Sequence, residues 1–227
     1  CQSRLRSTNV SPKSFLLSEE IHRYLLDHST PLDAVRTRLI TETAALGPVG
    51  GMQVAPEQSI FLTLLTRITG VRSALEVGTF TGLSALSIAM GLAPGGHLLC
   101  CDVSEEWTAV ARRYWAEAGV DDRIELRLAP AIETLRALSD KPAFDLAFID
   151  ADKPGYIAYW EETVPRIRPG GIVLVDNVLQ GGHIIDPAAE GESLAAIRAF
   201  NDHAAADERV ELVVLPISDG LTLARRR

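Results

Sequence analysis

The chain is poor in lysine and has no long apolar run, and each shortage argues against a class of protein. Lysine supplies only three of its 22 basic residues, at positions 13, 141 and 153, and the formal net charge is -8. Phosphate binding needs a concentrated basic face, so we expect no nucleic-acid partner. No apolar stretch approaches the ~20 residues that cross a bilayer, and the opening residues lack the apolar segment of a signal peptide. We therefore expect a cytoplasmic protein without a membrane partner.

Cysteine is scarce as well, and its spacing excludes two further kinds of site. The three cysteines, two of them adjacent at Cys100 and Cys101, give neither a disulfide framework nor a zinc spacing. The five histidines show no metal-binding spacing either. No G-x-S-x-G motif or Cys/His pair indicates a hydrolase. We expect core thiols in a reducing compartment, in a chain of 227 residues that is long enough for one large domain.

From Ser73 onward, short apolar runs alternate regularly with helical segments. We expect strands near 74–77, 97–101, 124–128, 146–149, 172–175, 210–215 and 221–224. Helices are expected near 83–91, 105–118, 131–139, 155–166 and 192–205. Five such repeats predict an α/β fold with a doubly wound, mostly parallel seven-stranded sheet. The last two strands are joined by residues 216–220, too few for a crossover helix, so they should form an antiparallel hairpin.

The first seventy residues show helical patterns instead of strands. One segment opens at Ser18, a second runs from Pro31 through Leu46, and a third begins at Pro56, which fits the first turn of a helix. A glycine-rich connector at 47–51 separates the second from the third. We expect one domain over 1–227, in which 1–70 form a helical cap or a dimer surface and 71–227 form the core.

Acidic and amide side chains end two neighbouring strands of this predicted sheet. Asp150 follows FDLAFI, and Asp176 and Asn177 follow GGIVLV, with Lys153 beside them. Open α/β sheets bind ligands at the carboxyl ends of their strands. Three hard oxygen ligands suit Mg²⁺, although Ca²⁺ and Mn²⁺ accept the same oxygens. Helix-capping acids and an Asx turn are the structural alternative, but two independent strand ends favour the metal site.

The first strand-to-helix turn, EVGTFTG at 76–82, is the second candidate site. Its glycines would let the backbone approach a ligand closely, at a helix N-terminus with free N–H groups. Glu76 would repel a pyrophosphate and favours a cofactor with an ammonium and a sulfonium, while Ser84 could donate to a carboxylate. A purely structural tight turn is the alternative.

Asp102 ends the next strand, where a carboxylate can accept both hydroxyls of a ribose. Its structural alternative is the N-cap of the helix expected from Glu105.

Taken in order and spacing, EVGTFTG, Asp102, IDADK and VDN resemble the cation-dependent S-adenosylmethionine (SAM) O-methyltransferases, the caffeoyl-CoA and catechol O-methyltransferase family. The resemblance extends from Met52 to the C-terminal hairpin. It implies a class I, Rossmann-like methyltransferase fold, usually as a homodimer. The cofactor pocket that it implies comprises Val54, Glu76, Gly78, Thr79, Ser84, Asp102, Ala131 and Asp152. It also implies that Asp150, Asp176 and Asn177 bind the metal and that Lys153 is the catalytic base beside Asp150 and Asn177.

The substrate side departs from the family pattern. Lys13, in KSFLLSEE, matches the N-terminal substrate-contacting segment only loosely. The loop at 180–191 lacks the asparagine that plant coenzyme A ester enzymes carry, which counts against a coenzyme A thioester. We expect methyl transfer to one hydroxyl of a vicinal aromatic diol, such as a phenylpropanoid, a flavonoid or another natural product.

Two other functions are compatible with the same sheet. A nicotinamide-dependent oxidoreductase would need G-x-G-x-x-G and has no use for IDADK together with VDN. A non-catalytic dimeric binding module is disfavoured by the intact Lys153. The sequence therefore favours the methyltransferase hypothesis.

Overall fold

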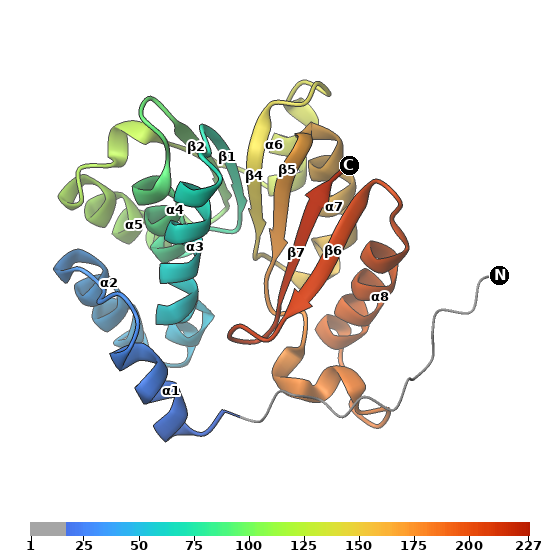
Figure 1. The fold of residues 1–227 in the computed structure, drawn as a ribbon, viewed down its shortest axis with the longest axis horizontal. Coiled ribbons are helices and arrows are strands. Elements are labelled where there is room, and N and C mark those ends of the chain that lie inside the picture. Colours follow the sequence, from blue (N-terminus) through green and yellow to red (C-terminus); the bar gives the residue numbers. More distant parts are fainter. Residues whose placement is uncertain (1–16) are drawn as a thin grey trace. The chain divides into compact units, whose positions relative to one another are not determined.

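The computed structural model describes residues 17–227, drawn in Figure 1, so Lys13 lies outside the described residues. Helix α1 (Glu19–Asp27) belongs to a different compact unit from residues 32–227, and it is described by itself. Its N-cap is Ser18, whose side chain accepts a hydrogen bond from the Ile21 N–H, and acidic residues occupy its first turn. An N-cap oxygen and early acids both stabilise a helix start. The predicted opening at Ser18 is therefore confirmed.

Residues 32–227 are built on a seven-stranded sheet (Figure 1). Its strands are β1 (Ser73–Val77), β2 (His97–Asp102), β3 (Ile124–Leu128), β4 (Phe144–Ile149), β5 (Ile167–Val175), β6 (Val210–Leu215) and β7 (Leu221–Arg226). They lie in the order β3-β2-β1-β4-β5-β7-β6, and β7 runs antiparallel to both of its neighbours. This confirms the predicted fold class and its reversed C-terminal strand. The strand order changes direction between β1 and β4, which is where such sheets bind ligands.

Helices cover both faces of the sheet (Figure 1). They are α2 (Ala34–Ala44), α3 (Pro56–Ile68), α4 (Leu83–Gly91), α5 (Glu105–Glu117), α6 (Ala131–Ala137), α7 (Tyr156–Thr163) and α8 (Glu192–Ala206). One core packs Trp160 of α7 and Phe200 of α8 against the sheet. The other packs Leu62 of α3 and Trp115 of α5 against the opposite face. No helix within residues 17–227 is both long and apolar enough to span a membrane.

Among the element boundaries that differ from the sequence prediction, three have a local reason. Strand β5 begins at Ile167, five residues early, because the Pro-Gly-Gly stretch at 169–171 stays in the strand at a register shift against β4. Helix α6 ends at Ala137, since Leu138 has extended geometry. Helix α7 ends at Thr163, and a 3₁₀ turn containing Pro165 follows it. Pro165 has no N–H to donate to the preceding turn, so the regular α-helical hydrogen bonds cannot continue through it.

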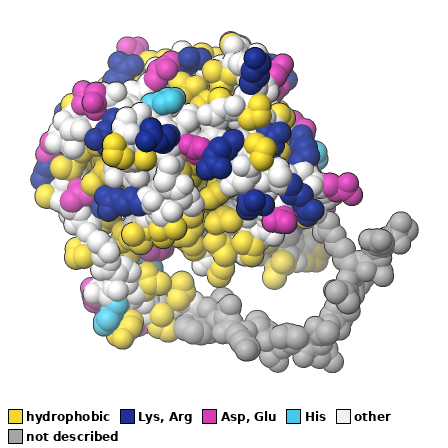
Figure 2. Space-filling view, turned by 45° about the horizontal axis from the view of Figure 1, so that its top comes forward, with side chains coloured by type: hydrophobic (Ala, Val, Ile, Leu, Met, Phe, Trp, Pro, Cys, Tyr) yellow, Lys and Arg dark blue, Asp and Glu magenta, His cyan; other side chains and the backbone are white. Residues whose placement is uncertain are grey.

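The surface carries a mixture of charges. On the face shown in Figure 2, arginine and lysine side chains are interspersed with acidic and apolar ones and form no continuous basic surface.

Candidate active site

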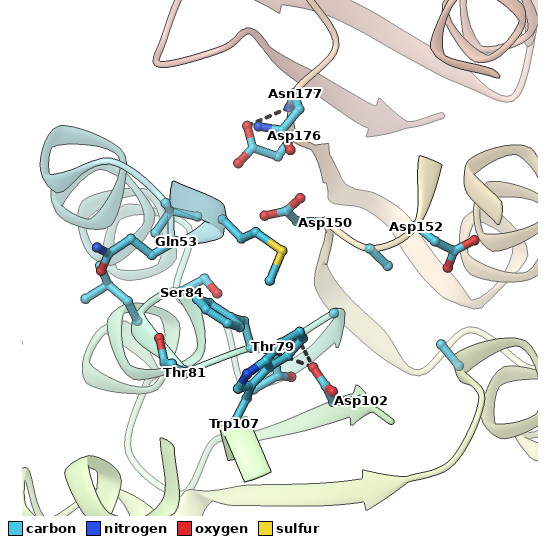
Figure 3. A pocket seen from close by; sticks show the side chains of 18 of the residues that line it. Gln53, Thr79, Thr81, Ser84, Asp102, Trp107, Asp150, Asp152, Asp176 and Asn177 are labelled. Atoms are coloured by element: carbon cyan, nitrogen blue, oxygen red, sulfur yellow. Dashed lines mark hydrogen bonds between the residues drawn. The ribbon is translucent and has the colours of Figure 1, made fainter. Parts of the chain in front are cut away.

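A cavity of about 750 Å³ opens at the carboxyl ends of the central strands (Figure 3). Among the residues predicted from the sequence, its lining includes Val54, Gly78, Thr79, Ser84, Asp102, Ala131, Asp150, Asp152, Lys153, Asp176 and Asn177. Segments far apart in the chain supply these side chains. Glu76 alone of the predicted set does not line the cavity. The fold thus brings the two candidate sites into one space, while the roles of the residues remain predictions.

The glycines of the 76–82 turn have structural reasons to be glycine. Gly78 has φ +88°, and a Cβ on it would lie 2.0 Å from the Asp150 carbonyl oxygen. Gly82 has φ +86°, and a Cβ there would lie 2.5 Å from Ala111 Cβ. Both positions combine a left-handed backbone with a close approach, which only glycine tolerates. The tight-turn alternative therefore accounts for these glycines, and the case for a ligand rests on the polar residues around them.

Asp102 holds this turn in place through backbone hydrogen bonds. Its Oδ2 accepts from the N–H groups of Thr79 and Phe80, both at 2.8 Å, and its Oδ1 accepts from the Ser104 N–H at 2.7 Å. The N-cap alternative is wrong, because Ser104 caps α5 by accepting from the Trp107 N–H. A carboxylate has about four lone-pair sites. Asp102 can therefore accept further hydrogen bonds from the cavity while it organises the turn.

Glu76 lies behind the cavity wall. It is fully buried, and its Oε2 accepts from Thr79 Oγ1 at 3.0 Å and from Cys100 Sγ at 3.4 Å. Its Oε1 has no hydrogen-bond partner among the described residues. Burial raises the pKa of Glu76 to about 7, against the opposing effect of the nearby Ser84 and Thr79 hydroxyls. Any influence of Glu76 on a ligand would therefore pass through Thr79 and Ser84, which do line the cavity.

The acidic cluster at the ends of β4 and β5 is organised around Lys153. Its Nζ donates to Asp150 Oδ1 at 2.9 Å, to Asn177 Oδ1 at 2.7 Å and to the Tyr156 hydroxyl at 2.6 Å. An ammonium has three donors, and all three are used here. The fold thus joins three of the residues that the sequence predicted to act together. Tyr156 is an addition that the sequence analysis missed.

Asp176 is the buried member of this cluster, with only 1% of its surface exposed. Its Oδ1 accepts from the Asn177 N–H at 2.7 Å. Burial, together with the negative charge of Asp150, raises the pKa of Asp176 to about 7. Asn177 has φ +56°, a left-handed conformation that asparagine tolerates better than most residues. The N–H groups of Val178 and Leu179, two residues after Asp176 and Asn177, donate to the carbonyls of Gly220 and Asp219, so neither side chain forms the Asx turn of the structural alternative.

The cluster fits a hard cation, although it differs from a carboxylate-rich metal site. No group of three or more His, Cys, Asp or Glu side chains within residues 17–227 converges as a metal site. The predicted set instead combines two carboxylates with one amide. Oxygens of Asp150 and Asn177 already converge on one positive charge, the Lys153 ammonium. Because Asp150 and Asp176 also repel one another, a divalent cation would relieve both desolvation and repulsion.

Asp152 serves the capping role that was its structural alternative. Its carboxylate accepts from the Gly155 N–H at 3.1 Å and from the Tyr159 hydroxyl at 2.5 Å. In Figure 3 it lies on the opposite side of the strand end from Asp176 and Asn177. Asp152 lines the cavity while it caps the turn, so a cofactor contact by its side chain remains a prediction.

Two further features of the site were not found from the sequence. Tyr156 OH donates to the Asp176 carbonyl at 3.2 Å as well as accepting from Lys153. Trp107 lines the cavity and makes an edge contact with Phe80 at 4.9 Å between ring centroids. The sequence shows only aromatic residues near helix starts, a pattern equally typical of core packing.

The loop at 180–191 forms one edge of the cavity through Gln180. Arg198 of α8 fastens this loop, and its guanidinium donates to the backbone carbonyls of His183, Ile184, Asp186 and Ala189. On the other side, Asp219 of the β6–β7 turn accepts from the Gly181 N–H at 2.5 Å. The loop is therefore held by side chains instead of by strand pairing.

Comparison with known proteins gives a consistent picture. Residues 27–227 match the model of a family described as O-methyltransferase. The chain is 41% identical to the "Probable caffeoyl-CoA O-methyltransferase 1" of Dictyostelium discoideum, over 92% of this chain and 93% of that protein. An O-methyltransferase from Bacillus cereus, solved in complex with SAH, is 32% identical with a TM-score of 0.81, covering 92% of this chain and 97% of that one. An O-methyltransferase from Streptomyces achromogenes involved in tomaymycin synthesis, solved with SAM, is 29% identical with a TM-score of 0.80, covering 91% and 96%.

Proposed function

Since the chain belongs to the O-methyltransferase family, we propose that it transfers the methyl group of SAM to one hydroxyl of a vicinal aromatic diol, with a divalent cation in the site. Its activity as a SAM-dependent O-methyltransferase follows from the family, and the acceptor and the cation are the proposal. The observation that carries the proposal is the Lys153 cluster, in which one amine meets Asp150 and Asn177 beside the glycine-rich turn.

For the cofactor, we assign the half of the cavity around the 76–82 turn. Asp102, oriented by three backbone N–H groups, would accept the ribose hydroxyls. The turn itself would face the methionine end, with Glu76 behind Thr79 and Ser84. Val54 and Ala131, which line the cavity from outside the turn, would provide apolar contacts.

For the cation, we assign Asp150, Asp176 and Asn177, with Mg²⁺, Ca²⁺ and Mn²⁺ as the candidates. The fit rests on the convergence of Asp150 and Asn177 oxygens on a positive charge and on the repulsion between the two carboxylates. When bound, the cation would supply positive charge that lowers the pKa of the acceptor hydroxyl.

The chain's own residues then handle the proton and the geometry. Lys153, as the free amine, takes the proton of the acceptor hydroxyl. The resulting oxygen attacks the methyl carbon of SAM, a C–O bond forms, and the C–S bond breaks with its electron pair remaining on sulfur. The products are the methyl ether, S-adenosylhomocysteine and the Lys153 ammonium. Tyr156, whose hydroxyl lies 2.6 Å from Lys153 Nζ, fixes the amine at the end of β5, and the protein contributes mainly orientation.

The acceptor is proposed as a small diol, and two observations bear on its size. The Dictyostelium relative is named for caffeoyl-CoA, which favours a phenylpropanoid-type ring. The loop at 180–191 counts against the coenzyme A portion, for the sequence reason given above. We also propose a homodimer, in which Leu64 and Ile68 on α3 would be covered, since these apolar side chains are 45% and 80% exposed.

Metal removal tests the proposal most directly. The protein is assayed with SAM and a simple catechol in EDTA and then with excess Mg²⁺, while calorimetry follows SAM binding. We expect activity to be lost in EDTA and restored by Mg²⁺, with SAM still bound. Full activity without metal would contradict the cation assignment. Metal-stimulated methyl transfer to other acceptors but to no vicinal diol would contradict the acceptor assignment.

A further inference from the structure

Two fully buried threonines join helix α2 to the glycine-rich turn. Thr43, in the last turn of α2, donates from its Oγ1 to Thr81 Oγ1 at 2.8 Å, across 38 positions of the chain. Both residues are fully buried, although Thr81 also lines the cavity (Figure 3). Two valines would fill the same space without the desolvation of two hydroxyls, and such paired replacements can be nearly neutral for stability. What the threonine pair adds is direction, because the hydrogen bond fixes where the turn lies against the helix.

The residues on either side of Thr81 are held from other elements. Asp102, at the end of β2, accepts from the two backbone N–H groups directly before Thr81. Trp115 of α5 donates from its Nε1 to the Gly82 carbonyl, directly after Thr81, at 3.1 Å. The turn is therefore fixed from a strand, from α5 and, through Thr43, from α2. The contact with α2 makes the position of the turn depend on a helix that precedes the whole sheet in the sequence.

The same end of α2 also contacts a second wall of the cavity. A Cβ on Gly50 would lie 2.4 Å from the Thr43 carbonyl oxygen, so the 3₁₀ helix at Gly47–Met52 packs directly against this end of α2. Gln53, the next residue, lines the cavity and donates from its Nε2 to the Ile40 carbonyl at 3.4 Å. Thr43 is thus shared by two contacts, one with the glycine-rich turn and one with the segment that leads into α3.

Helix α2 is itself fixed at both of its ends. Near its start, the buried Arg36 donates from its Nη1 to Ser59 Oγ at 3.4 Å and to Thr63 Oγ1 at 3.3 Å, both on α3. Near its end, Glu42 Oε2 accepts from the Tyr114 hydroxyl of α5 at 2.7 Å. A helix that is held at both ends provides a fixed position from which the Thr43 hydroxyl can hold the turn.

We propose that Thr43 is a positioning residue for the cofactor, whose hydroxyl acts through Thr81 to hold the 76–82 turn in the conformation that binds SAM. The inference rests on the assignment of this turn to the cofactor in the proposed function. A protein that populates its binding conformation only in part binds its ligand more weakly by that fraction. Loss of the Thr43 hydroxyl lets the turn leave this conformation in the free protein, whereas bound SAM restores it. The affinity for SAM should therefore fall, while turnover of the SAM-loaded enzyme stays intact.

The test is a double-mutant cycle on SAM binding, measured by calorimetry without acceptor or cation. Thr43→Val should weaken SAM binding by roughly 3- to 10-fold, which is the effect of one neutral hydrogen bond. Thr81→Val should do the same, and the double variant should bind no more weakly than either single variant, because both substitutions break one bond. Thr43→Ser keeps the hydroxyl and should restore the wild-type affinity. With Mg²⁺ and a simple catechol, kcat at saturating SAM should be unchanged in Thr43→Val.

Thr163, at the end of α7, provides a matched control. Its hydroxyl is also fully buried, without a hydrogen-bond partner among the described residues, so Thr163→Val should leave SAM affinity unchanged. A folded Thr43→Val variant with wild-type SAM affinity overturns the inference, as do additive effects of the two single substitutions. If Thr43→Val does not fold, unchanged SAM affinity in Thr81→Val overturns it. Failure of the wild type to bind SAM would overturn the cofactor assignment itself, whereas SAM binding without methyl transfer to any diol would count only against the acceptor.

Discussion

The two sides of the cavity are held together by different means. On the strand side, backbone hydrogen bonds from the Gly78 N–H to the Cys101 carbonyl and from the Asp150 N–H to the Val77 carbonyl join the turn to the strand ends, in addition to the bonds made by Asp102. On the loop side, residues 180–191 are fixed by the side chains of Arg198 and Asp219. A backbone network is shared with the fold, whereas one guanidinium can be removed without disturbing the sheet. Substitutions on the strand side should therefore affect folding and cofactor binding. Substitutions on the loop side should affect only the binding of the acceptor.

The largest effect is expected at the junction of the two sides, in Lys153→Arg. Arginine keeps the positive charge but cannot lose its proton at working pH, so kcat should fall by about 10²- to 10⁴-fold with little change in SAM affinity. Steady-state kinetics and calorimetry measure the two quantities. Lys141→Arg, at an exposed lysine, is the control and should behave as wild type. A near-normal kcat would reduce Lys153 to an electrostatic role.

On the strand side, Glu76 should make folding sensitive to pH. Its pKa is about 7 in the folded protein against the ordinary glutamate value of 4.5. Between these pH values the folded state holds a proton that the unfolded state has lost. The free energy of unfolding should then fall as pH rises from 4.5 to 7, by about 3 kcal/mol for this group. Urea unfolding of wild type and Glu76→Gln across this range measures the difference. Parallel pH profiles would show that Glu76 is ionised in the folded state.

The effect of Asp102→Ala on cofactor binding tests the role of the strand side. The substitution removes the acceptor for three backbone N–H groups and for the proposed ribose contact. Hydrogen bonds to charged groups contribute about 1.5–3 kcal/mol, so the KM for SAM should rise roughly 10- to 100-fold. The KM for the acceptor should stay near wild type. An effect confined to the acceptor would mean that the ribose assignment is wrong.

The smallest effect is expected on the loop side, in Arg198→Met. The apolar stem is kept while four carbonyl contacts are lost, so the KM for the acceptor should rise by roughly 3- to 10-fold, a net loss of about 1 kcal/mol. SAM affinity should be unchanged, and limited proteolysis should cut faster within 181–190. Arg113→Met, which removes an exposed ion pair with Glu42, is the control and should change neither. Weakened SAM binding in Arg198→Met would contradict the prediction that the loop side affects only the acceptor.

The strand side was also the part that the sequence could predict. Parallel strands, their acidic ends and the glycine-rich turn are local patterns, and the topology brings their ends together. The capping alternative for Asp102 failed because Ser104, two residues later, takes that role. Glu76 was placed in the pocket because its strand ends there, but side chains alternate along a strand, and only the packing of Thr79 and Cys100 around it shows which way it faces.

The contacts that sequence reasoning missed join residues far apart in the chain. Arg198 is an ordinary basic residue on an amphipathic helix until the loop at 180–191 is placed beside it. Tyr156 is indistinguishable by pattern from a core aromatic, and it is indeed fully buried. Periodicity specifies which face of an element is buried, but not which partner it meets there.

Gly78 passes so close to the end of β4 that a Cβ would lie 2.0 Å from the Asp150 carbonyl oxygen. Any mutation that shifts the 76–82 turn must therefore also displace Asp150 at the start of the acidic cluster. A structural change in one of the two sites thus changes the other. The 180–191 loop makes no comparable close backbone approach to the 76–82 turn. It can therefore accept insertions and replacements without changes elsewhere in the site. Divergence in this lineage should consequently accumulate in the loop, with new acceptors arising around an unaltered methyl donor.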